Sequence, residues 1–239
     1  MAAQDGFRGV DETDPVGPSG HAYGIRVSSR LTSDYRTRVR RLTMDVTPQE
    51  VIDCVRQAGI KNWVLMGLHG YVGYLPMPRA TQDVDVMVPY SEKARAAKAI
   101  ASRWPTLLRR DLSQVVRFLD PEDKDHEGKP KPVIDLMLPW SPFQETILRH
   151  HVVTDPQTGN RHPTVEAAIV SKYAPLVSPF RDWDKKQQDA VDLRRIIRAN
   201  HDRIDRDVIR ELGNQVWDQG GEELLTFLDL AMEDKPFPV

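Results

Sequence analysis

Several common kinds of site are missing from this sequence. Its 239 residues include one cysteine, Cys54, so the chain can form neither an internal disulfide framework nor a cysteine-rich zinc site. No GxxxxGK[ST] segment occurs, which argues against a P-loop kinase or ATPase. His150, His151 and His162 surround a turn-forming segment without carboxylates or cysteines at metal-ligand spacing, so we expect a surface hairpin there.

The sequence also lacks a segment typical of membrane insertion or secretion. The longest mainly apolar run, residues 63–77, is broken by His69, three glycines and Pro76, and it falls short of the roughly 20 apolar residues that span a bilayer. The first 20 residues have no apolar stretch behind a basic start, as a signal peptide would. We therefore expect a cytoplasmic protein with a disordered tail over residues 1–22.

The charges that are present are unevenly distributed. The chain has 33 basic and 35 acidic residues, yet residues 21–41 contain six arginines against Asp34 alone, a local charge of about +5. Guanidinium groups bind phosphate through paired hydrogen bonds, so a basic arm over residues 23–46 is a candidate contact for nucleic acid. The alternative is a solvated arm whose arginines pair with acidic residues of the same protein. These arginines are Arg26, Arg30, Arg36, Arg38, Arg40 and Arg41.

Hydrophobic periodicity predicts an α+β fold with a helical C-terminal lobe. Thr47-Pro48-Gln49-Glu50 has the form of a capping box and begins a helix that ends near Gly59. We expect a sheet domain over residues 47–155 and a helical lobe over residues 156–239. Strands are expected at 62–66, 82–89, 115–119 and 133–138, the last two as a hairpin, and helices near 164–176, 184–199, 203–217 and 221–232.

The strand at 82–89 places two acidic side chains on one face. Alternation puts Asp83 and Asp85 on one side and three valines on the other. Asp135 lies in an otherwise apolar strand, where a lone carboxylate is costly to bury. A half-exposed strand and a satisfied polar residue would explain the two observations separately. If the strands are neighbours, however, the three carboxylates form a cluster that can hold Mg²⁺ and, through it, a nucleoside triphosphate.

These residues resemble a known family of enzymes. A glycine that opens a helix, Gly67, followed some sixteen residues later by Asp83-Val84-Asp85, resembles the polymerase-β-type nucleotidyltransferases. The segment RATQDVDV at 79–86 is most similar to AbiEii-like nucleotidyltransferases, the toxins of bacterial abortive-infection and toxin-antitoxin systems. Residues 171–174 (SKYA) and 185–193 (KKQQDAVDL) are similar to the C-terminal motifs of that family, and the resemblance covers residues 63–197.

The resemblance implies a minimal polymerase-β-like fold with residues 47–155 as the nucleotidyltransferase core. It implies that Asp83, Asp85 and Asp135 are catalytic and bind magnesium in a two-metal site, with an NTP as substrate. It also implies an RNA acceptor, such as a tRNA 3′ end, and a partner antitoxin protein. The residues implied to bind the nucleotide or its phosphates are Gly67, His69, Gly70, Arg79, Thr81, Lys172, Lys186 and Asp189.

Three residues depart from the family pattern. The family has a second glycine and a small residue where this chain has Leu68 and His69. Leu68 leaves less room for phosphate, so either His69 supplies a donor or nucleotide binding is weakened. Gln188 stands where the family commonly has a basic residue, and Lys186 is a candidate for that role.

Lys172 is a candidate from periodicity as well. It falls within the apolar stripe of its predicted helix, and a lysine on an inward face must snorkel, form a pair or face a polar cleft. Asp189 shares a face with Lys186 in the next predicted helix, where it either orients that lysine or forms an ordinary surface ion pair.

The sequence therefore predicts a metal-dependent enzyme that transfers an NMP from an NTP to an acceptor hydroxyl, with RNA as the acceptor. A small-molecule acceptor is the second enzymatic possibility, because aminoglycoside and lincosamide resistance enzymes share the glycine and DxD layout. A third possibility is a catalytically degenerate fold that binds a nucleotide or a partner protein.

Overall fold

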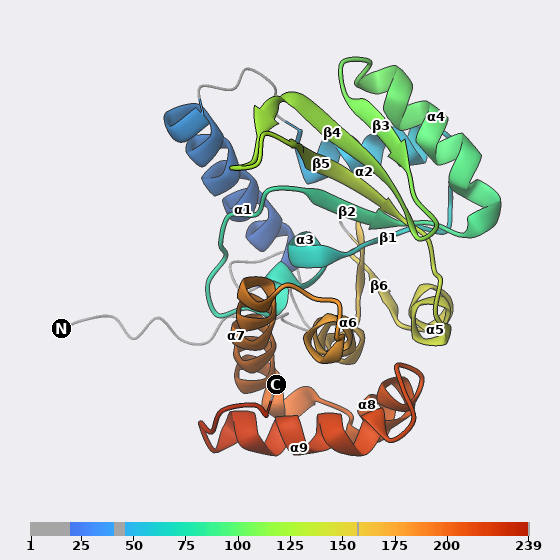
Figure 1. Ribbon diagram of the computed structural model, residues 1–239. Coiled ribbons are helices and arrows are strands. Elements are labelled where there is room, and N and C mark those ends of the chain that lie inside the picture. Colours follow the sequence, from blue (N-terminus) through green and yellow to red (C-terminus); the bar gives the residue numbers. More distant parts are fainter. Residues whose placement is uncertain (1–19, 41–45, 157, 239) are drawn as a thin grey trace.

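The computed structural model describes residues 20–40, 46–156 and 158–238, except for the side chains of residues 39 and 40. Residues 1–19 of the expected tail, and Arg41 of the arginine-rich segment, lie outside these residues, whereas His21 and Ala22 at the end of that tail are helical and buried. The described chain forms a sheet domain above a layer of C-terminal helices (Figure 1). The predicted α+β class with a helical C-terminal lobe is confirmed.

Five strands form the main sheet, in the order β1-β2-β5-β4-β3. Their bounds are β1 (Val64–Leu65), β2 (Val84–Met87), β3 (Leu108–Asp111), β4 (Val115–Lys124) and β5 (Pro130–Met137). β2 runs parallel to β5, and the other neighbouring strands are antiparallel. The predicted hairpin is confirmed as β4–β5. The edge strand β3 is exposed along its whole length, so it shows no alternation and is not among the expected strands.

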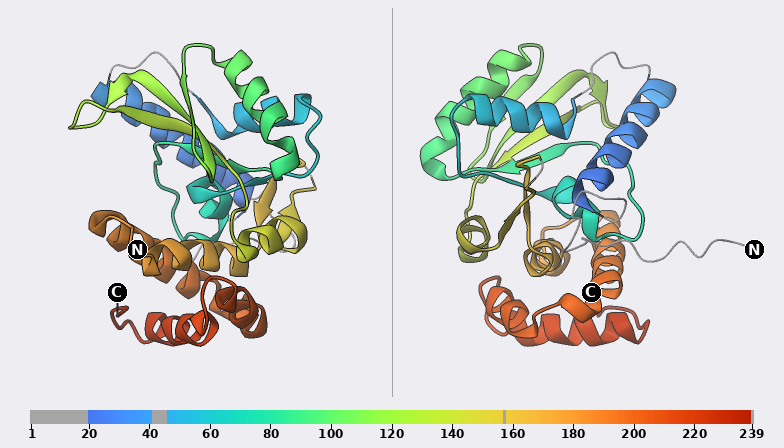
Figure 2. Two further views of the ribbon diagram at one scale, coloured as in Figure 1. Left: turned by 45° about the vertical axis from the view of Figure 1, so that its right-hand side comes forward. Right: turned by 180° about the vertical axis from the view of Figure 1, so that it is seen from behind.

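One face of the sheet is covered by α2 (Pro48–Gln57) and α4 (Lys93–Arg103), seen from behind in the right-hand view of Figure 2. The predicted capping box of α2 is present, because the Thr47 side chain accepts from the Glu50 backbone N–H and the Glu50 carboxylate accepts from the Thr47 N–H. Val84, Val86 and Val88 of the acidic strand are buried in the core on this face.

A second core lies between the other face of the sheet and the helical lobe. Val64 and Met87 belong to it, whereas Leu65 and Val86 belong to the first core, as the two-residue repeat of strands requires. The helices that contribute to it are α3 (Gly67–Tyr71), α5 (Pro142–His150), α6 (Val165–Val177), α7 (Trp183–Asn200), α8 (Arg206–Asn214) and α9 (Gly220–Met232). Short 3₁₀ turns occur at Val72–Tyr74, Tyr90–Glu92 and His201–Arg203.

The arginine-rich segment forms α1 (His21–Tyr35) and a π-helical turn, Arg36–Arg40, which pack on the sheet domain. Hydroxyl groups of α1 fix the loop before β2, since Ser28 donates to the Arg79 carbonyl and Thr32 accepts from the Thr81 backbone N–H. Arg26, Arg30 and Arg38 are exposed, whereas Arg36 is buried and donates to the Gln82 carbonyl.

The hairpin expected around the three C-terminal histidines is present as β6 (Val152–Thr154) and β7 (Arg161–Pro163). His162 is nevertheless fully buried, because its ring stacks on that of His21 in α1, with ring centroids 3.9 Å apart. The expectation of a surface hairpin was therefore wrong for this residue. None of the helices in the described ranges combines the length and apolarity needed to cross a bilayer.

Candidate active site

Three carboxylates meet on the sheet face that points toward the helical lobe. β2 and β5 are parallel neighbours, and their register sets Asp85 directly opposite Asp135. Asp83 precedes Asp85 by two residues and shares its face. One carboxylate oxygen from each of the three lies within 4.8 Å of the others. The two strands that the sequence could only suggest as neighbours are therefore paired.

Burial disfavours the charged form of these groups. Burial, followed by the charge of Asp135, raises the pKa of Asp83. Burial and the charges of Asp83 and Asp135 raise the pKa of Asp85 well above its ordinary value, and Lys172 and Arg117 only partly offset this. The cluster is short of positive charge, and its all-oxygen donor set suits a hard divalent cation such as Mg²⁺.

Gly67 makes room for the acidic cluster. Its backbone has φ of +55°, and a Cβ at this position would lie 1.9 Å from Oδ2 of Asp85. The carboxylate therefore rests against bare backbone, which only glycine permits. Gly70 has a different role, because a Cβ there would lie 2.6 Å from the carbonyl oxygen of Leu65. Gly70 therefore allows α3 to pack closely on β1.

Leu68 and His69, which follow Gly67, are both buried. Leu68 is buried in the second core. His69 is 2% exposed, and neither ring nitrogen has a hydrogen-bond partner among the described residues. Burial, followed by the charges of Arg36 and Arg79, lowers the pKa of His69 to about 3.

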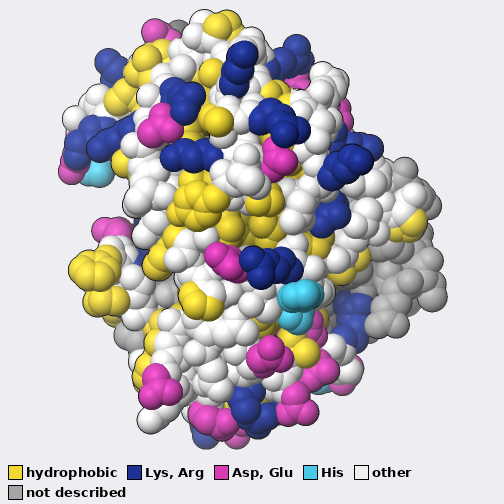
Figure 3. Space-filling view, turned by 90° about the vertical axis from the view of Figure 1, so that its right-hand side faces the viewer, with side chains coloured by type: hydrophobic (Ala, Val, Ile, Leu, Met, Phe, Trp, Pro, Cys, Tyr) yellow, Lys and Arg dark blue, Asp and Glu magenta, His cyan; other side chains and the backbone are white. Residues whose placement is uncertain are grey.

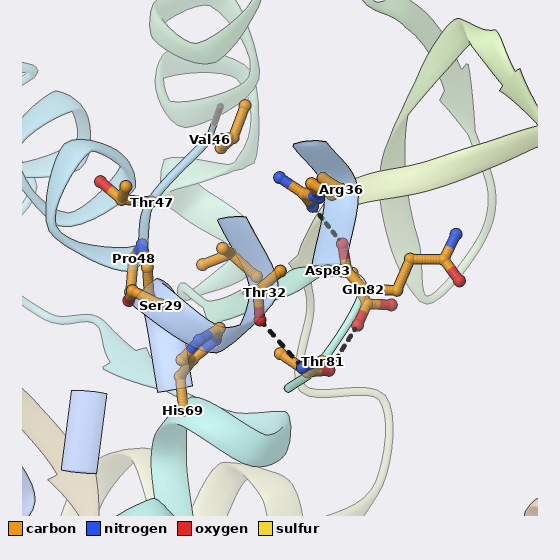
Figure 4. Close-up of a pocket in the computed structure, with 11 residues that line it drawn as sticks. Ser29, Thr32, Arg36, Val46, Thr47, Pro48, His69, Thr81, Gln82 and Asp83 are labelled. Carbon is orange, nitrogen blue, oxygen red and sulfur yellow. Dashed lines mark hydrogen bonds between the residues drawn. The ribbon is translucent and has the colours of Figure 1, made fainter. Parts of the chain in front are cut away.

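His69 lines a small cavity between α1 and the segment 81–84 that leads into β2 (Figure 4). Its volume of about 10 Å³ has room for about one water molecule, so a triphosphate does not fit there. Thr81, on the same wall, lies with its hydroxyl 3.4 Å from Oδ1 of Asp83 and so restrains that carboxylate.

The C-terminal candidates form a buried ionic network beside the acidic cluster. Nζ of Lys172 lies 2.7 Å from Oδ1 of Asp189 and 3.2 Å from Oδ2 of Asp192. Nη2 of Arg79 lies 2.7 Å from Oδ2 of Asp192, and Nη2 of Arg181 lies 2.9 Å from Oδ2 of Asp189. Three cations thus face two carboxylates, which leaves one positive charge in excess.

Asp192 is the centre of this network, although the sequence reasoning did not select it as a site residue. Its side chain is fully buried and also accepts hydrogen bonds from Tyr71 and Gln188. The available signal was its spacing, three residues after Asp189 and on the same face of α7. Lys186, by contrast, forms no side-chain hydrogen bond or ion pair with the described residues.

The network keeps both of its central groups charged. Burial alone would lower the pKa of Lys172, but Tyr71, Asp192 and Asp189 together raise it above its ordinary value. Burial alone would raise the pKa of Asp192, but hydrogen bonding to Arg79 and the charge of Lys172 hold it below its ordinary value. Lys172 is therefore a permanent cation near the acidic cluster.

Arg117 is a second residue that the sequence reasoning missed. It lies on β4 directly opposite Asp135 of β5. Its Nε lies 2.9 Å from Oδ1, and its Nη2 lies 2.9 Å from Oδ2 of that carboxylate. Because the strand register of the hairpin cannot be read from the sequence, nothing in the sequence distinguishes the half-buried Arg117 from the exposed Arg109 and Arg110.

Comparison with solved structures finds weak similarities to nucleotidyltransferase-like proteins. One is an antigenic nucleotidyltransferase-like protein from Paracoccidioides brasiliensis, with a TM-score of 0.45 and 14% identity over 83% of this chain and 94% of the other. Another is terminal uridylyl transferase 4 from Trypanosoma brucei with bound GTP, with a TM-score of 0.31 and 15% identity over 89% of this chain and 74% of the other.

No family model and no curated protein sequence matches the chain. At these scores the structural similarities are too weak to assign a function. The function proposed below therefore depends on the side chains of this chain itself.

We predict that Gly67→Ala is markedly more destabilising than Gly128→Ala. Both glycines have positive φ, so both substitutions cost about 1–2 kcal/mol in backbone strain. Only at Gly67 does the new methyl group collide with a carboxylate, whereas nothing lies within 4 Å of a Cβ at Gly128. Overpacking should add about 1–3 kcal/mol. Equal losses in the free energy of urea unfolding for the two variants would contradict the placement of Asp85 against Gly67.

A second prediction concerns the buried network. Asp192→Ala should lower the free energy of unfolding by about 3–5 kcal/mol, because Lys172 and Arg79 lose a buried partner. Asp229→Ala breaks an exposed pair with Arg206 and should cost less than about 1 kcal/mol. Chemical denaturation of both variants measures the difference, and a loss below about 1 kcal/mol for Asp192→Ala would show that the network does not hold the lobes together.

Proposed function

We propose that this chain is a nucleotidyltransferase that transfers an NMP from an NTP to an acceptor hydroxyl and depends on a divalent metal ion. The observation that carries the proposal is the close approach of three carboxylates, from Asp85 in β2, Asp135 in β5 and Asp83 just before β2. One oxygen from each lies within 4.8 Å of the others, and Gly67 leaves room for the Asp85 carboxylate. The resemblance of the glycine and DxD segment to polymerase-β-type nucleotidyltransferases supports the same conclusion.

Asp83 and Asp85 would hold magnesium. The donor atoms are all hard oxygens, which magnesium prefers. The raised pKa values of both groups also indicate that their charged forms would be stabilised by a cation. A bound magnesium ion would neutralise the triphosphate and polarise its phosphoryl oxygens. Asp135, beside Asp85, would either complete a second cation site or accept the proton of the acceptor hydroxyl.

In the reaction, the acceptor oxygen forms a bond to the α-phosphorus and the bond from that phosphorus to the pyrophosphate oxygen breaks. The hydroxyl proton passes to a carboxylate or to solvent, and pyrophosphate leaves. Lys172 and Arg79 would stabilise the negative charge of the triphosphate, because their network carries one positive charge in excess. Such fixed charges stabilise the transition state without reorganising.

RNA is the acceptor class we propose. Arg26 and Arg30 project into solvent from α1, the helix that holds the loop before the acidic strand. On the face shown in Figure 3, Lys and Arg side chains are frequent over the sheet domain, whereas Asp and Glu are concentrated over the C-terminal helices. Together with the resemblance to AbiEii-like toxins, the exposed arginines of α1 favour RNA over an aminoglycoside or lincosamide. The resemblance also supports a toxin role with a partner antitoxin.

We predict that Asp83→Asn and Asp85→Asn each reduce NMP transfer more than about 100-fold, since both would lose a metal ligand. Transfer is measured as incorporation of α-labelled NTP into total RNA. Both variants should remain folded, because each removes one of several buried like charges. Asp111→Asn, at the exposed end of β3, is the matched control and should leave transfer unchanged. Full transfer by either site variant would overturn the proposal.

A further prediction tests the acceptor. RNA held by arginines should lose affinity steeply as salt rises, and Arg30→Gln should reduce the slope of log affinity against log salt by about 1. Arg206→Gln, an exposed arginine of the C-terminal lobe, should leave the slope unchanged. RNA binding that does not depend on salt would exclude this acceptor surface. Nucleotide binding without transfer would favour a catalytically degenerate module.

A further inference from the structure

A row of four charged side chains crosses one face of the sheet. The strand registers set Asp85 opposite Asp135, Asp135 opposite Arg117, and Arg117 opposite Arg110. Side chains that lie directly opposite each other on neighbouring strands project from the same face. The row therefore runs from the acidic cluster through two guanidinium groups to the exposed edge strand β3.

Arg117 engages both oxygens of Asp135. The contact consists of Nε to Oδ1 at 2.9 Å, Nε to Oδ2 at 3.1 Å and Nη2 to Oδ2 at 2.9 Å. The Asp135 side chain is 9% exposed and the Arg117 side chain is 37% exposed. A two-point contact of this kind is the strongest that a carboxylate makes with a side chain. Both oxygens of Asp135 are thus paired with Arg117, whereas Asp83 and Asp85 make no ion pair among the described residues.

The charge count shows what this contact does to the cluster. In the ionised forms that bind a cation, the three carboxylates contribute three negative charges, and the guanidinium of Arg117, which stays protonated, contributes one positive charge. The resulting charge of −2 is balanced by one divalent cation. A second cation would have to compete with Arg117 for the oxygens of Asp135.

We propose that Arg117 covers Asp135 so that, without nucleotide, the site binds one divalent cation through Asp83 and Asp85. Asp135 becomes available when a triphosphate, whose oxygens match the guanidinium fork as well as a carboxylate does, draws Arg117 away. Arg117 is a positioning residue in this account, because it acts through Asp135. The inference rests on the proposed function, since that function supplies both the cation and the triphosphate.

Arg110 offers a matched control on the same face. It is the next side chain along the row, it is exposed, and it forms no ion pair with the described residues. Arg110→Gln therefore removes the same charge one strand further from the cluster without uncovering a carboxylate.

The test is a Mn²⁺ titration without nucleotide, with free Mn²⁺ followed by electron paramagnetic resonance. The wild-type protein and Arg110→Gln should bind one ion. Arg117→Gln should bind two, the first at least about tenfold more tightly than wild type, because a neighbouring positive charge is gone. The double variant, Arg117→Gln with Asp135→Asn, lacks both partners of the ion pair and again has a cluster charge of −2. It should bind one ion with wild-type affinity.

Two wild-type ions without nucleotide, or identical titrations of wild type and Arg117→Gln, would overturn the inference. If Arg117→Gln alone does not fold, the double variant provides the test. If the double variant binds no ion, Asp135 is already a ligand in the wild-type protein, and the inference is wrong. If the wild-type protein transfers NMP yet binds two ions without nucleotide, this inference is wrong and the proposed function is unaffected. If the wild-type protein binds no Mn²⁺ and transfers no NMP, both this inference and the proposed function are wrong.

Discussion

The parallel pairing of β2 with β5 is the constraint on which the site depends. It brings Asp85 beside Asp135, although the two residues are separated by two antiparallel strands and a helix in the chain. The valines on the opposite face of β2 fix the pairing, because a shift by one residue would move them out of the core and bury the aspartates. The hydrophobic core thus determines where the carboxylates meet.

This arrangement is costly for folding and useful for binding. Burial and the neighbouring carboxylates raise the pKa values of Asp83 and Asp85, and a protein selected for stability alone would not gather three such groups. Arg117 on one side and the network of Lys172 and Asp192 on the other limit the cost. The network also joins α6 and α7 of the helical lobe to Arg79 in the loop before β2, so the two parts of the molecule meet at the site.

Much of the fold follows from local patterns in the sequence. The two-residue repeat predicted the faces of β2, and the 3.6-residue repeat predicted α6, α7 and α9 within about two residues at their ends. The capping box located the start of α2 because its hydrogen bonds are made within four residues. The edge strand β3 could not be predicted, since all its residues are exposed and no alternation remains.

The features that escaped prediction at the site are long-range. The inward helix face of Lys172 predicts that it snorkels, forms a pair or faces a polar cleft, but which of these occurs depends on how α6 meets α7. The position of Arg117 depends on the register of the β4–β5 hairpin, which contains two irregularities. The burial of His162 depends on α1, more than a hundred residues earlier. None of these contacts leaves a periodic signal in the sequence.

The central claim is that Asp83 and Asp85 hold a divalent cation that meets a triphosphate. Anomalous diffraction from crystals soaked with Mn²⁺ and a non-hydrolysable NTP analogue tests it most directly. We expect an anomalous peak at bonding distance from carboxylate oxygens of both aspartates and from a phosphate oxygen of the analogue. A peak bonded to neither aspartate, or a nucleotide bound away from these carboxylates, would contradict the account.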